Sequence, residues 1–416
     1  MAKLWFVSAP LYSHTDWGGF LKTAHILHSQ GHDVTWVSEP PLRDAIAAHE
    51  LPFAAIEQTG WLWPPPPQPD LSQLKPQEAV ALRYRRALDT WLSEDRVAQG
   101  VASLLDLAAR VGKPDAIITD PFLSASALAA EKLSVPMIVA GWPAQANLDA
   151  QALFPVQRDL SSDSQQRIQR LCDRFSLEGV YFSKGAAPSI VSPHLHITYF
   201  TSQWYMGESA VLLPQTEHVG GQPDAPDDPP PDWLQAIPEK QPLALITLGT
   251  IFSGDLGFYA WSAQAAARNG LLPVVAIGWH PITPEQKAEL KRALPGGTRL
   301  LNWAPFAHVL PRSRLMLHHG GMGTTHHAIV HAVPQIVVPH AADQRIQARR
   351  VAQAKLGLNL SAHDVRQGML QEGTKALLEA DWVTENCQRF ARQMAALGGP
   401  TRAAELIVQT IEQVKR

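Results

Sequence analysis

The residues best suited to chemistry in this sequence form a glycine-rich run between two histidine pairs. The run is His318-His319-Gly320-Gly321-Met322-Gly323-Thr324-Thr325-His326-His327, and it opens a helical pattern that extends to about residue 331. Glycines at a strand-to-helix turn let the backbone approach a ligand closely. Amide groups at the start of a helix, together with the helix dipole, favour a phosphate group. Because Thr324, Thr325 and His319 add side-chain donors, the run predicts a phosphate-binding turn.

A second polar pair follows the next apolar stretch along the chain. Residues 335–339 have the composition of a buried strand, and Asp343 and Gln344 come shortly after it. In open α/β sheets, ligands bind at the carboxyl ends of the strands. A carboxylate beside an amide suits sugar hydroxyls, because one group accepts hydrogen bonds and the other both donates and accepts. The alternative interpretation is that both side chains only cap the following helix.

The elements that must position these residues alternate between short apolar runs and longer amphipathic stretches. Such alternation predicts βαβ units and parallel sheets. A proline-rich segment interrupts the pattern, which then restarts, so we expect two Rossmann-like α/β domains. The predicted domains are an N-terminal domain at 1–220, a linker at 221–235, a C-terminal domain at 236–400 and a final helix at 401–416 that packs back towards the N-terminal domain. The predicted strands lie at 4–9, 33–38, 116–119, 137–140, 243–248, 272–277, 314–317 and 335–339, and helices are predicted at 20–30, 124–132 and 402–415.

Composition excludes several classes of protein. The formal net charge of −3 argues against general nucleic-acid binding, because proteins that bind nucleic acids have an excess of basic residues. Two cysteines, Cys172 and Cys387, are too few for a disulfide scaffold or a thiolate zinc site. His327 and His331 share a helical spacing but have no acidic or cysteine partner nearby, so no metal site is expected. The apolar start of the chain is interpreted as a strand rather than a signal peptide, and a cytoplasmic location is expected.

A tryptophan–proline segment, Trp61-Leu62-Trp63-Pro64-Pro65-Pro66-Pro67, lies in a stretch without clear strand signals. It predicts one of two things: a rigid surface loop that packs its tryptophans inward, or an apolar lip for a hydrophobic ligand or a membrane surface. The second interpretation leaves room for peripheral association with a membrane. It makes Trp61 and Trp63 candidates for acceptor binding, together with Trp142, which follows the strand predicted at 137–140.

At this point the motifs resemble a known family. The set Trp303…His319-Gly-Gly-Met-Gly-Thr-Thr…Val333-Pro334-Gln335…Asp343-Gln344 resembles the signature of family-one glycosyltransferases, which act on macrolides, glycopeptides, sterols, carotenoids and plant natural products. Thr247-Leu248-Gly249-Thr250 resembles the turn that opens the family's C-terminal domain. Residues 398–404 are similar to the closing segment of carotenoid glucosyltransferases. The likeness is dense over 240–416 and looser over 1–220.

The resemblance implies a GT-B fold, in which two Rossmann-like domains face a cleft, with the nucleotide sugar on the C-terminal domain and the acceptor on the N-terminal domain. Trp303 would stack on the nucleobase, and Asp343 and Gln344 would bind the sugar. The donor-binding residues implied in this way are Thr250, Trp303, His319, Gly321, Gly323, Thr324, Asp343 and Gln344. No cofactor or metal is implied, because the helix dipole and the donors stabilise the leaving diphosphate.

One position departs from the family pattern. Many members carry a glutamate for the ribose hydroxyls eight residues after the phosphate histidine, where this chain has His327. The departure leaves the choice between a UDP and a dTDP donor open, although UDP-glucose is the donor expected.

The family's catalytic base follows the first strand. Pro10-Leu11-Tyr12-Ser13-His14 resembles the family's turn and makes His14 the base, while counting backward from Gly31-His32 places that position on Asp16. An ordinary histidine titrates near working pH. Asp120, at the end of a predicted strand, is the expected orienting partner, and its alternative role is to cap the next helix.

These features together predict an inverting, metal-independent transfer of a hexose, expected to be glucose, to a hydroxyl of a hydrophobic small-molecule or lipid-like acceptor. Two alternatives from the sequence stay open. A sugar-nucleotide epimerase shares the GT-B fold and changes the donor without an acceptor. A non-catalytic protein would bind nucleotide sugars without turnover. The sequence does not predict the oligomeric state.

Overall fold

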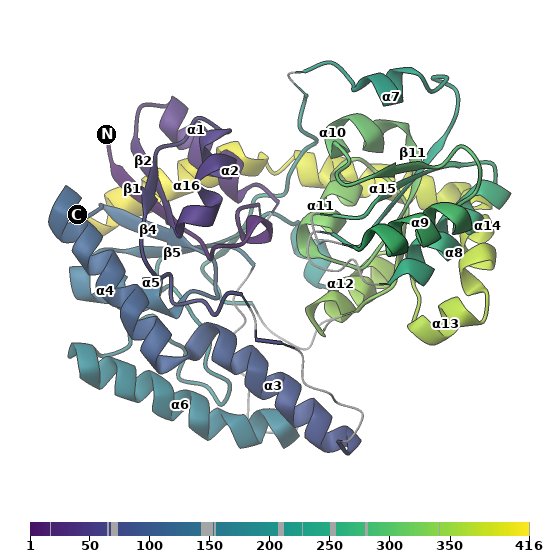
Figure 1. Ribbon diagram of the computed structural model, residues 1–416. Coiled ribbons are helices and arrows are strands. Elements are labelled where there is room, and N and C mark those ends of the chain that lie inside the picture. Colours follow the sequence, from purple (N-terminus) through teal and green to yellow (C-terminus); the bar gives the residue numbers. More distant parts are fainter. Residues whose placement is uncertain are drawn as a thin grey trace. The chain divides into compact units, whose positions relative to one another are not determined.

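The computed structural model contains two parallel β-sheets, each flanked by helices (Figure 1). It describes the chain except residues 17, 65, 68–73, 143–152, 154, 207–211, 227, 250–254, 279–281, 341 and 416, and at positions 76, 342 and 343 it describes the backbone alone. The chain divides into two compact units. The first comprises Met1–Tyr199, Glu208–Val219 and Gly398–Arg416, and the second comprises Phe200–Gly207 and Gly220–Leu397.

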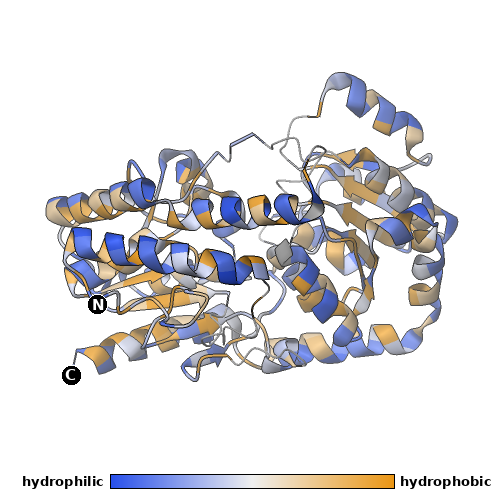
Figure 2. Ribbon diagram, turned by 90° about the horizontal axis from the view of Figure 1, so that it is seen from below, coloured by the Kyte–Doolittle hydropathy of each residue, from blue (hydrophilic) through white to orange (hydrophobic). Residues whose placement is uncertain are grey.

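The first unit contains a seven-stranded sheet with the order β3-β2-β1-β4-β5-β6-β7. Its strands are β1 (Lys3–Val7), β2 (Asp33–Ser38), β3 (Phe53–Ala55), β4 (Ala116–Thr119), β5 (Met137–Gly141), β6 (His196–Thr198) and β7 (Thr216–His218). The central strands β1, β4 and β5 are almost wholly buried, as expected for parallel strands covered on both faces. Figure 2 shows this pattern, with mostly orange strands and blue residues gathered on the helices.

Helices cover both faces of this sheet, which separates two hydrophobic clusters. These helices are α1 (Phe20–Ser29), α2 (Arg43–Ala47), α3 (Pro76–Leu92), α4 (Glu94–Val111), α5 (Ser124–Leu133), α6 (Pro155–Phe175) and α16 (Gly399–Val414). One cluster joins α4 and α5 to the sheet, and the other joins α1 and α16 to it. The last helix, α16, therefore packs beside α1 although it follows all of the second unit in the sequence.

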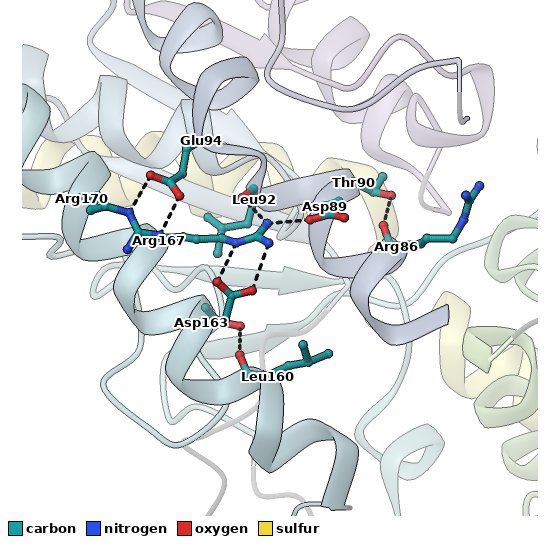
Figure 3. A network of polar contacts seen from close by, with 10 residues as sticks. Arg86, Asp89, Thr90, Leu92, Glu94, Leu160, Asp163, Arg167 and Arg170 are labelled. Carbon is teal, nitrogen blue, oxygen red and sulfur yellow. Dashed lines mark hydrogen bonds and ion pairs between the residues drawn. The ribbon is translucent and has the colours of Figure 1, made fainter. Parts of the chain in front are cut away.

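An ion-pair network fastens α6 to the neighbouring long helices α3 and α4 (Figure 3). Arg167 of α6 donates to Asp89 of α3 at 2.7 Å and also pairs with Asp163. Arg170 makes a two-pronged contact with Glu94 of α4, at 2.9 and 2.8 Å. A planar guanidinium favours such paired contacts. The network fixes the carboxyl end of α3, which holds the segment around Trp61 through a hydrogen bond from the Leu62 N–H to the Thr90 carbonyl.

The second unit contains a six-stranded sheet with the order β10-β9-β8-β11-β12-β13. Its strands are β8 (Leu243–Thr247), β9 (Leu272–Ala276), β10 (Arg299–Leu301), β11 (Ser313–His318), β12 (Gln335–Val337) and β13 (Gly357–Asn359). Its helices are α7 (Asp232–Gln235), α8 (Leu256–Arg268), α9 (Pro284–Ala293), α10 (Phe306–Val309), α11 (Met322–Val330), α12 (Ala342–Gln353), α13 (Ala362–Arg366), α14 (Met369–Glu379) and α15 (Asp381–Ala395).

The predicted α/β class with parallel sheets is confirmed, and so are the eight predicted strands, within one or two residues at their ends. The predicted linker at 221–235 ends in a short helix, α7, which begins at Asp232. Proline is tolerated immediately before a helix, and an acidic side chain in the first turn suits the helix dipole.

Both sheets share one topological feature that locates the candidate site. The strand order reverses between β1 and β4 in the first sheet and between β8 and β11 in the second. At such a switch point the following connections run to opposite sides and leave room for ligands at the carboxyl ends of the two strands. His14 and Asp120 follow β1 and β4, while Gly249 and His319 follow β8 and β11.

Candidate active site

The first sheet brings His14 and Asp120 together from positions more than one hundred residues apart. His14 ends a short 3-10 helix, η1 (Tyr12–His14), and Asp120 is the residue directly after β4. His14 Nδ1 lies 3.1 Å from Asp120 Oδ2, and Asp120 has no exposed surface. Since a carboxylate only accepts hydrogen bonds, His14 donates through Nδ1–H and its Nε2 becomes the basic nitrogen.

The other oxygen of Asp120 fixes the carboxylate in place. Asp120 Oδ1 accepts a hydrogen bond from the backbone N–H of Phe122 at 2.8 Å. This is a turn contact two residues along the chain. Helix α5 starts only at Ser124 and has no side-chain cap. The alternative in which Asp120 merely caps the next helix is therefore wrong.

Asp16, the other candidate base, lies two residues beyond His14 and is partly exposed. Burial, with the added charge of Asp16, raises the pKa of Tyr12 and of Tyr199. The structure thus places the Asp16 charge beside two phenols, while it is His14 that contacts Asp120.

Two aromatic side chains enclose the His14 ring. The ring centroid of Trp61 lies 5.0 Å from that of His14, and the centroid of Phe122 lies 6.1 Å from it. Trp61 and Phe122 also contact each other edge to face, at 6.2 Å. The tryptophan–proline pattern indicated Trp61, while no pattern indicated a role for Phe122. Its position two residues after Asp120 was the signal that could have found it.

The segment that carries Trp61 is held from three sides. Thr59 donates from its backbone and its hydroxyl to Glu39 Oε1, at 3.0 and 2.7 Å. Gly100 of α4 lies so close that a Cβ there would meet the backbone nitrogen of Gly60 at 2.7 Å. The backbone N–H of Leu62 donates to the Thr90 carbonyl at the end of α3. These contacts fix Trp61 against the base.

The other candidate acceptor residues, Trp63 and Trp142, are partly buried. Trp142 directly follows β5, and the next residues, 143–152, lie outside the described part of the chain. An acceptor role for these two tryptophans stays a prediction.

In the second sheet, the predicted phosphate turn joins β11 to α11, as the glycine pattern indicated. His319 is buried in this turn, and its ring lies between two glycines. A Cβ at Gly321 would lie 2.5 Å from His319 Nε2, and one at Gly249 would lie 2.7 Å from Cε1. Burial, with smaller contributions from His318 and His340, lowers the pKa of His319 well below its usual value. The ring is therefore neutral and offers one N–H donor.

The two threonines of the turn differ. Thr325 is fully buried, and its hydroxyl donates to the Gly321 carbonyl at 2.9 Å. The expectation that Thr325 is a donor to phosphate is therefore wrong, because its hydroxyl proton is used inside the helix. Gly323 and Thr324 lie in the first turn of α11 and are partly exposed.

His318, the last residue of β11, holds the turn in place through two hydrogen bonds of its ring. Its Nδ1 accepts a hydrogen bond from the backbone N–H of Gly320 at 3.0 Å, and its Nε2 lies 2.9 Å from Gln335 Oε1. Burial lowers the pKa of His318 to about 4. One acceptor and one donor nitrogen match a neutral ring, so His318 is a structural part of the turn.

Trp303 is the exposed member of an aromatic stack, with 42% of its surface accessible. Its ring is parallel to that of Phe306 at 6.4 Å, and Phe306 meets His327 edge to face at 5.2 Å. His327, which stands where many family members have glutamate, is thus an aromatic packing partner. An exposed, supported indole suits stacking on a base, and that role of Trp303 stays a prediction.

The remaining predicted donor residues are Thr250, Asp343 and Gln344. Thr250 and the Asp343 side chain lie outside the described residues, although Asp343 belongs to the first turn of α12. Gln344 is buried, and its Oε1 accepts the backbone N–H of His340 at 2.8 Å. Gln344 thus holds the segment that leads into α12, and its role in sugar binding stays a prediction.

Comparisons with known proteins agree with this arrangement. Residues 281–411 match the family model described as erythromycin biosynthesis protein CIII-like, C-terminal domain. The elloramycin glycosyltransferase ElmGT of Streptomyces olivaceus is 28% identical over 71% of this chain and 69% of its own length. The crystal structure of the kitacinnamycin glycotransferase superposes with a TM-score of 0.75 at 19% identity, over 99% of both chains. The chain is a GT-B glycosyltransferase.

Spinosyn rhamnosyltransferase SpnG, solved in complex with thymidine diphosphate, is a further structural neighbour. It superposes with a TM-score of 0.70 at 21% identity, over 99% of this chain and 100% of its own. The glycosyltransferase described here depends on a nucleotide sugar and resembles the macrolide and other antibiotic enzymes of family one. The epimerase and the non-catalytic alternatives are set aside on this ground.

Two further findings concern the described part of the glycosyltransferase. No group of three or more histidine, cysteine or acidic side chains could hold a metal ion there. No helix within it is both long and apolar enough to cross a bilayer.

Proposed function

We propose that this glycosyltransferase transfers a hexose, with inversion and without a metal ion, from a UDP- or dTDP-activated sugar to a hydroxyl of a hydrophobic acceptor. The observation that carries this proposal is the contact between buried Asp120 and His14. A carboxylate on Nδ1 holds the imidazole in one tautomer and stabilises the imidazolium that forms when Nε2 takes a proton.

The reaction balances as one displacement. His14 Nε2 removes the proton of the acceptor hydroxyl, and the oxygen attacks the anomeric carbon from the face opposite the diphosphate. A new carbon–oxygen bond forms while the bond to the diphosphate breaks, so the anomeric configuration inverts. The leaving diphosphate carries away the negative charge. Amides at the start of α11 and the neutral His319 ring are the groups that we assign to stabilise it.

The donor proposed first is UDP-glucose, with dTDP-glucose as its direct competitor. His327 stands where many family members have the glutamate that binds the ribose hydroxyls of UDP. A preference for UDP that depends on this glutamate is therefore not expected. The SpnG complex, which holds thymidine diphosphate, supports testing dTDP sugars, and its name as a rhamnosyltransferase supports including a deoxyhexose.

The acceptor side is supported by the aromatic surroundings of the base. Trp61 and Phe122 flank His14, so we expect the acceptor whose hydroxyl reaches Nε2 to be an apolar molecule. A polyketide, carotenoid or sterol alcohol has this character. Contact with a membrane surface would follow only if the acceptor itself resides there.

The test is an acceptor panel measured with UDP-glucose, dTDP-glucose and dTDP-rhamnose. Apolar polycyclic and macrocyclic alcohols are expected to be glycosylated, and the product is expected to have the anomeric configuration opposite to that of the donor. EDTA is expected to leave the rate unchanged. Turnover of small polar phenols alone would contradict the acceptor class, and a product with retained configuration would contradict the mechanism.

A further inference from the structure

A histidine outside the predicted donor set occupies an unusual place in the second unit. His340 lies between β12 and α12, three residues before Asp343. Its Nδ1 is 2.8 Å from the carbonyl oxygen of Val338, and its Nε2 is 3.2 Å from Asp255 Oδ2. Phe258 of α8 meets the ring edge to face at 6.1 Å. The ring is thus held from two sides, by the residue that follows β12 and by the start of α8.

Both of these hydrogen-bond partners can only accept. A backbone carbonyl has no proton to give, and neither has an ionised carboxylate. A neutral imidazole carries one N–H and could satisfy only one of them. Both contacts are made at once only when both ring nitrogens carry a proton. The hydrogen bond to His340 also lowers the pKa of Asp255, against the effect of burial, so this carboxyl group is ionised at neutral pH.

Asp255 does two things at the start of α8. Its Oδ1 accepts the backbone N–H of Phe258 at 2.9 Å and so caps the helix, while Oδ2 faces His340. Asp255 ends the connection that follows β8 and contains Thr250, and His340 lies in the connection that leads into α12, whose first turn contains Asp343. One carboxylate therefore joins the connection that contains Thr250 to the connection that leads into the first turn of α12, where the predicted sugar residues lie.

The other end of the sugar loop is fixed separately. A Cβ at Gly320 would meet the Gln344 carbonyl at 3.0 Å and Val337 Cγ1 at 2.8 Å, so the glycine turn is in tight contact with the start of α12. Gln344 in turn holds the His340 backbone. The loop is anchored at Gln344 by packing and at His340 by charge.

We propose that the His340–Asp255 ion pair is a positioning device that sets the sugar-binding turn at Asp343 and so controls affinity for the sugar of the donor. The proposal deepens the proposed function and rests on its assignment of the donor site. His340 and Asp255 are positioning residues, because each acts through the loop that it anchors.

Titratable groups from two elements interact with the His340 ring. They include Asp255 at the start of α8 and His319, which follows β11. His319 is neutral at working pH, because burial lowers its pKa well below the usual value. Burial, with the charge of Asp255, raises the pKa of Tyr259 on α8, so that phenol is also neutral.

Three variants separate the ion pair from the helix cap. Asp255→Ser keeps a capping oxygen but is too short to reach His340. Asp255→Asn keeps the cap and a hydrogen bond, because its amide can donate to a neutral ring. His340→Ala removes the ring. Asp364→Asn is the matched control, since Asp364 lies in the capping box of α13 in the same unit.

The first readout needs no substrate. Nitrogen-15 NMR of histidine-labelled protein at pH 7 is expected to show both ring nitrogens of His340 protonated in the wild type. One nitrogen should lose its proton in Asp255→Asn, while Asp364→Asn should leave the signal unchanged. A singly protonated His340 ring in the wild type would overturn the ion pair, whether or not the protein transfers a sugar.

The second readout is the dissociation constant for UDP-glucose against that for UDP, measured by calorimetry. Asp255→Ser and His340→Ala are each expected to weaken UDP-glucose about fivefold and UDP less than twofold, and Asp255→Asn should recover most of the loss. The double variant Asp255→Ser/His340→Ala should be no weaker than either single variant, because both remove one link.

Equal losses for UDP and UDP-glucose, or losses that multiply in the double variant, would contradict a role in positioning the sugar turn. If the wild type binds neither UDP-glucose nor dTDP-glucose, the proposed function fails and the sugar-positioning role falls with it. The NMR result then still decides whether the ion pair exists.

Discussion

His14 and His319 occupy comparable places in the two units and differ in almost every other respect. Each is buried beside a topological switch point, His14 after β1 and His319 after β11. His14 contacts a buried carboxylate, Asp120, and two aromatic rings. His319 is enclosed by glycine backbone and lies near two other histidines.

The difference shows that the surroundings of a histidine side chain determine whether it is suited to take up a proton or to stay neutral. A neighbouring carboxylate stabilises an imidazolium, so His14 is suited to take up a proton. Burial among histidines disfavours the charged form, so His319 stays neutral and can only donate or accept hydrogen bonds. We therefore expect the first unit to supply the base and the second to hold the donor. The predictions below test that division.

The largest effect is expected from His14→Ala. Without a base, the acceptor hydroxyl must lose its proton to water, so kcat should fall by about a thousandfold. The dissociation constant for UDP-glucose should stay within twofold, because His14 lies in the other unit. Transfer rates and calorimetry measure the two quantities. Asp16→Asn is the comparison variant, and a full loss there with an active His14→Ala would assign the base to Asp16.

Asp120→Asn should lower kcat by roughly a hundredfold. The asparagine oxygen can still accept the Phe122 N–H, but the carboxylate that orients His14 and stabilises its charge is gone. The acceptor KM should change little, because neither the acceptor nor the donor contacts the carboxylate in the proposed mechanism. A variant that loses activity only through unfolding, seen by circular dichroism, would leave Asp120 as a structural residue instead.

On the donor side, Gly321→Ala should weaken UDP-glucose and UDP about tenfold. A Cβ at this position would lie 2.5 Å from His319 Nε2, so the ring must move out of its place between the glycines. Gly296→Ala is the matched control, because a Cβ there meets nothing within 4 Å. Unchanged affinity in Gly321→Ala would remove His319 from the donor site.

Acid should destabilise the second unit, with an effect on the order of 5 °C in Tm between pH 7 and pH 5. Burial lowers the pKa of both His318 and His331 to about 4. The unfolded chain takes up protons below about pH 6.5 while these folded rings do not, so stability decreases as the pH falls from there towards 4.

Hydrogen exchange at pH 7 and pH 5 would locate this destabilisation, and His331→Asn should reduce it. His196 in the first unit has the same lowered pKa, about 4, and serves as the internal comparison. Equal acid sensitivity of the two units would show that the two histidines of the second unit do not dominate the response.

Much of the fold was predictable because it depends on local pattern. The buried parallel strands β1, β4, β8 and β11 are continuous apolar runs, and each was placed from the sequence. The strands that escaped prediction, such as β6 and β13, have only three residues each. So short a run has no periodicity of its own, and its conformation depends on the neighbouring strand.

The site was predictable in its residue types and much less so in its contacts. The glycine pattern indicated the turn at His319, but it could not show that the Thr325 hydroxyl is used within α11 or that His318 binds Gln335. The sequence patterns assigned no role to Phe122 or His340. Their roles arise from side chains distant in sequence, Trp61 for the first and Asp255 for the second.

The sequence alone determined the α/β class, the order of the strands along the chain and the residues able to act as base, partner and phosphate turn. Those properties are local, since they follow from hydrophobic period, turn residues and side-chain chemistry. Only the tertiary structure decided that Asp120 contacts His14, that His319 is neutral and that His340 faces two acceptors. Tautomer and charge depend on what surrounds a group in space, and parallel strands bring those surroundings from distant parts of the chain.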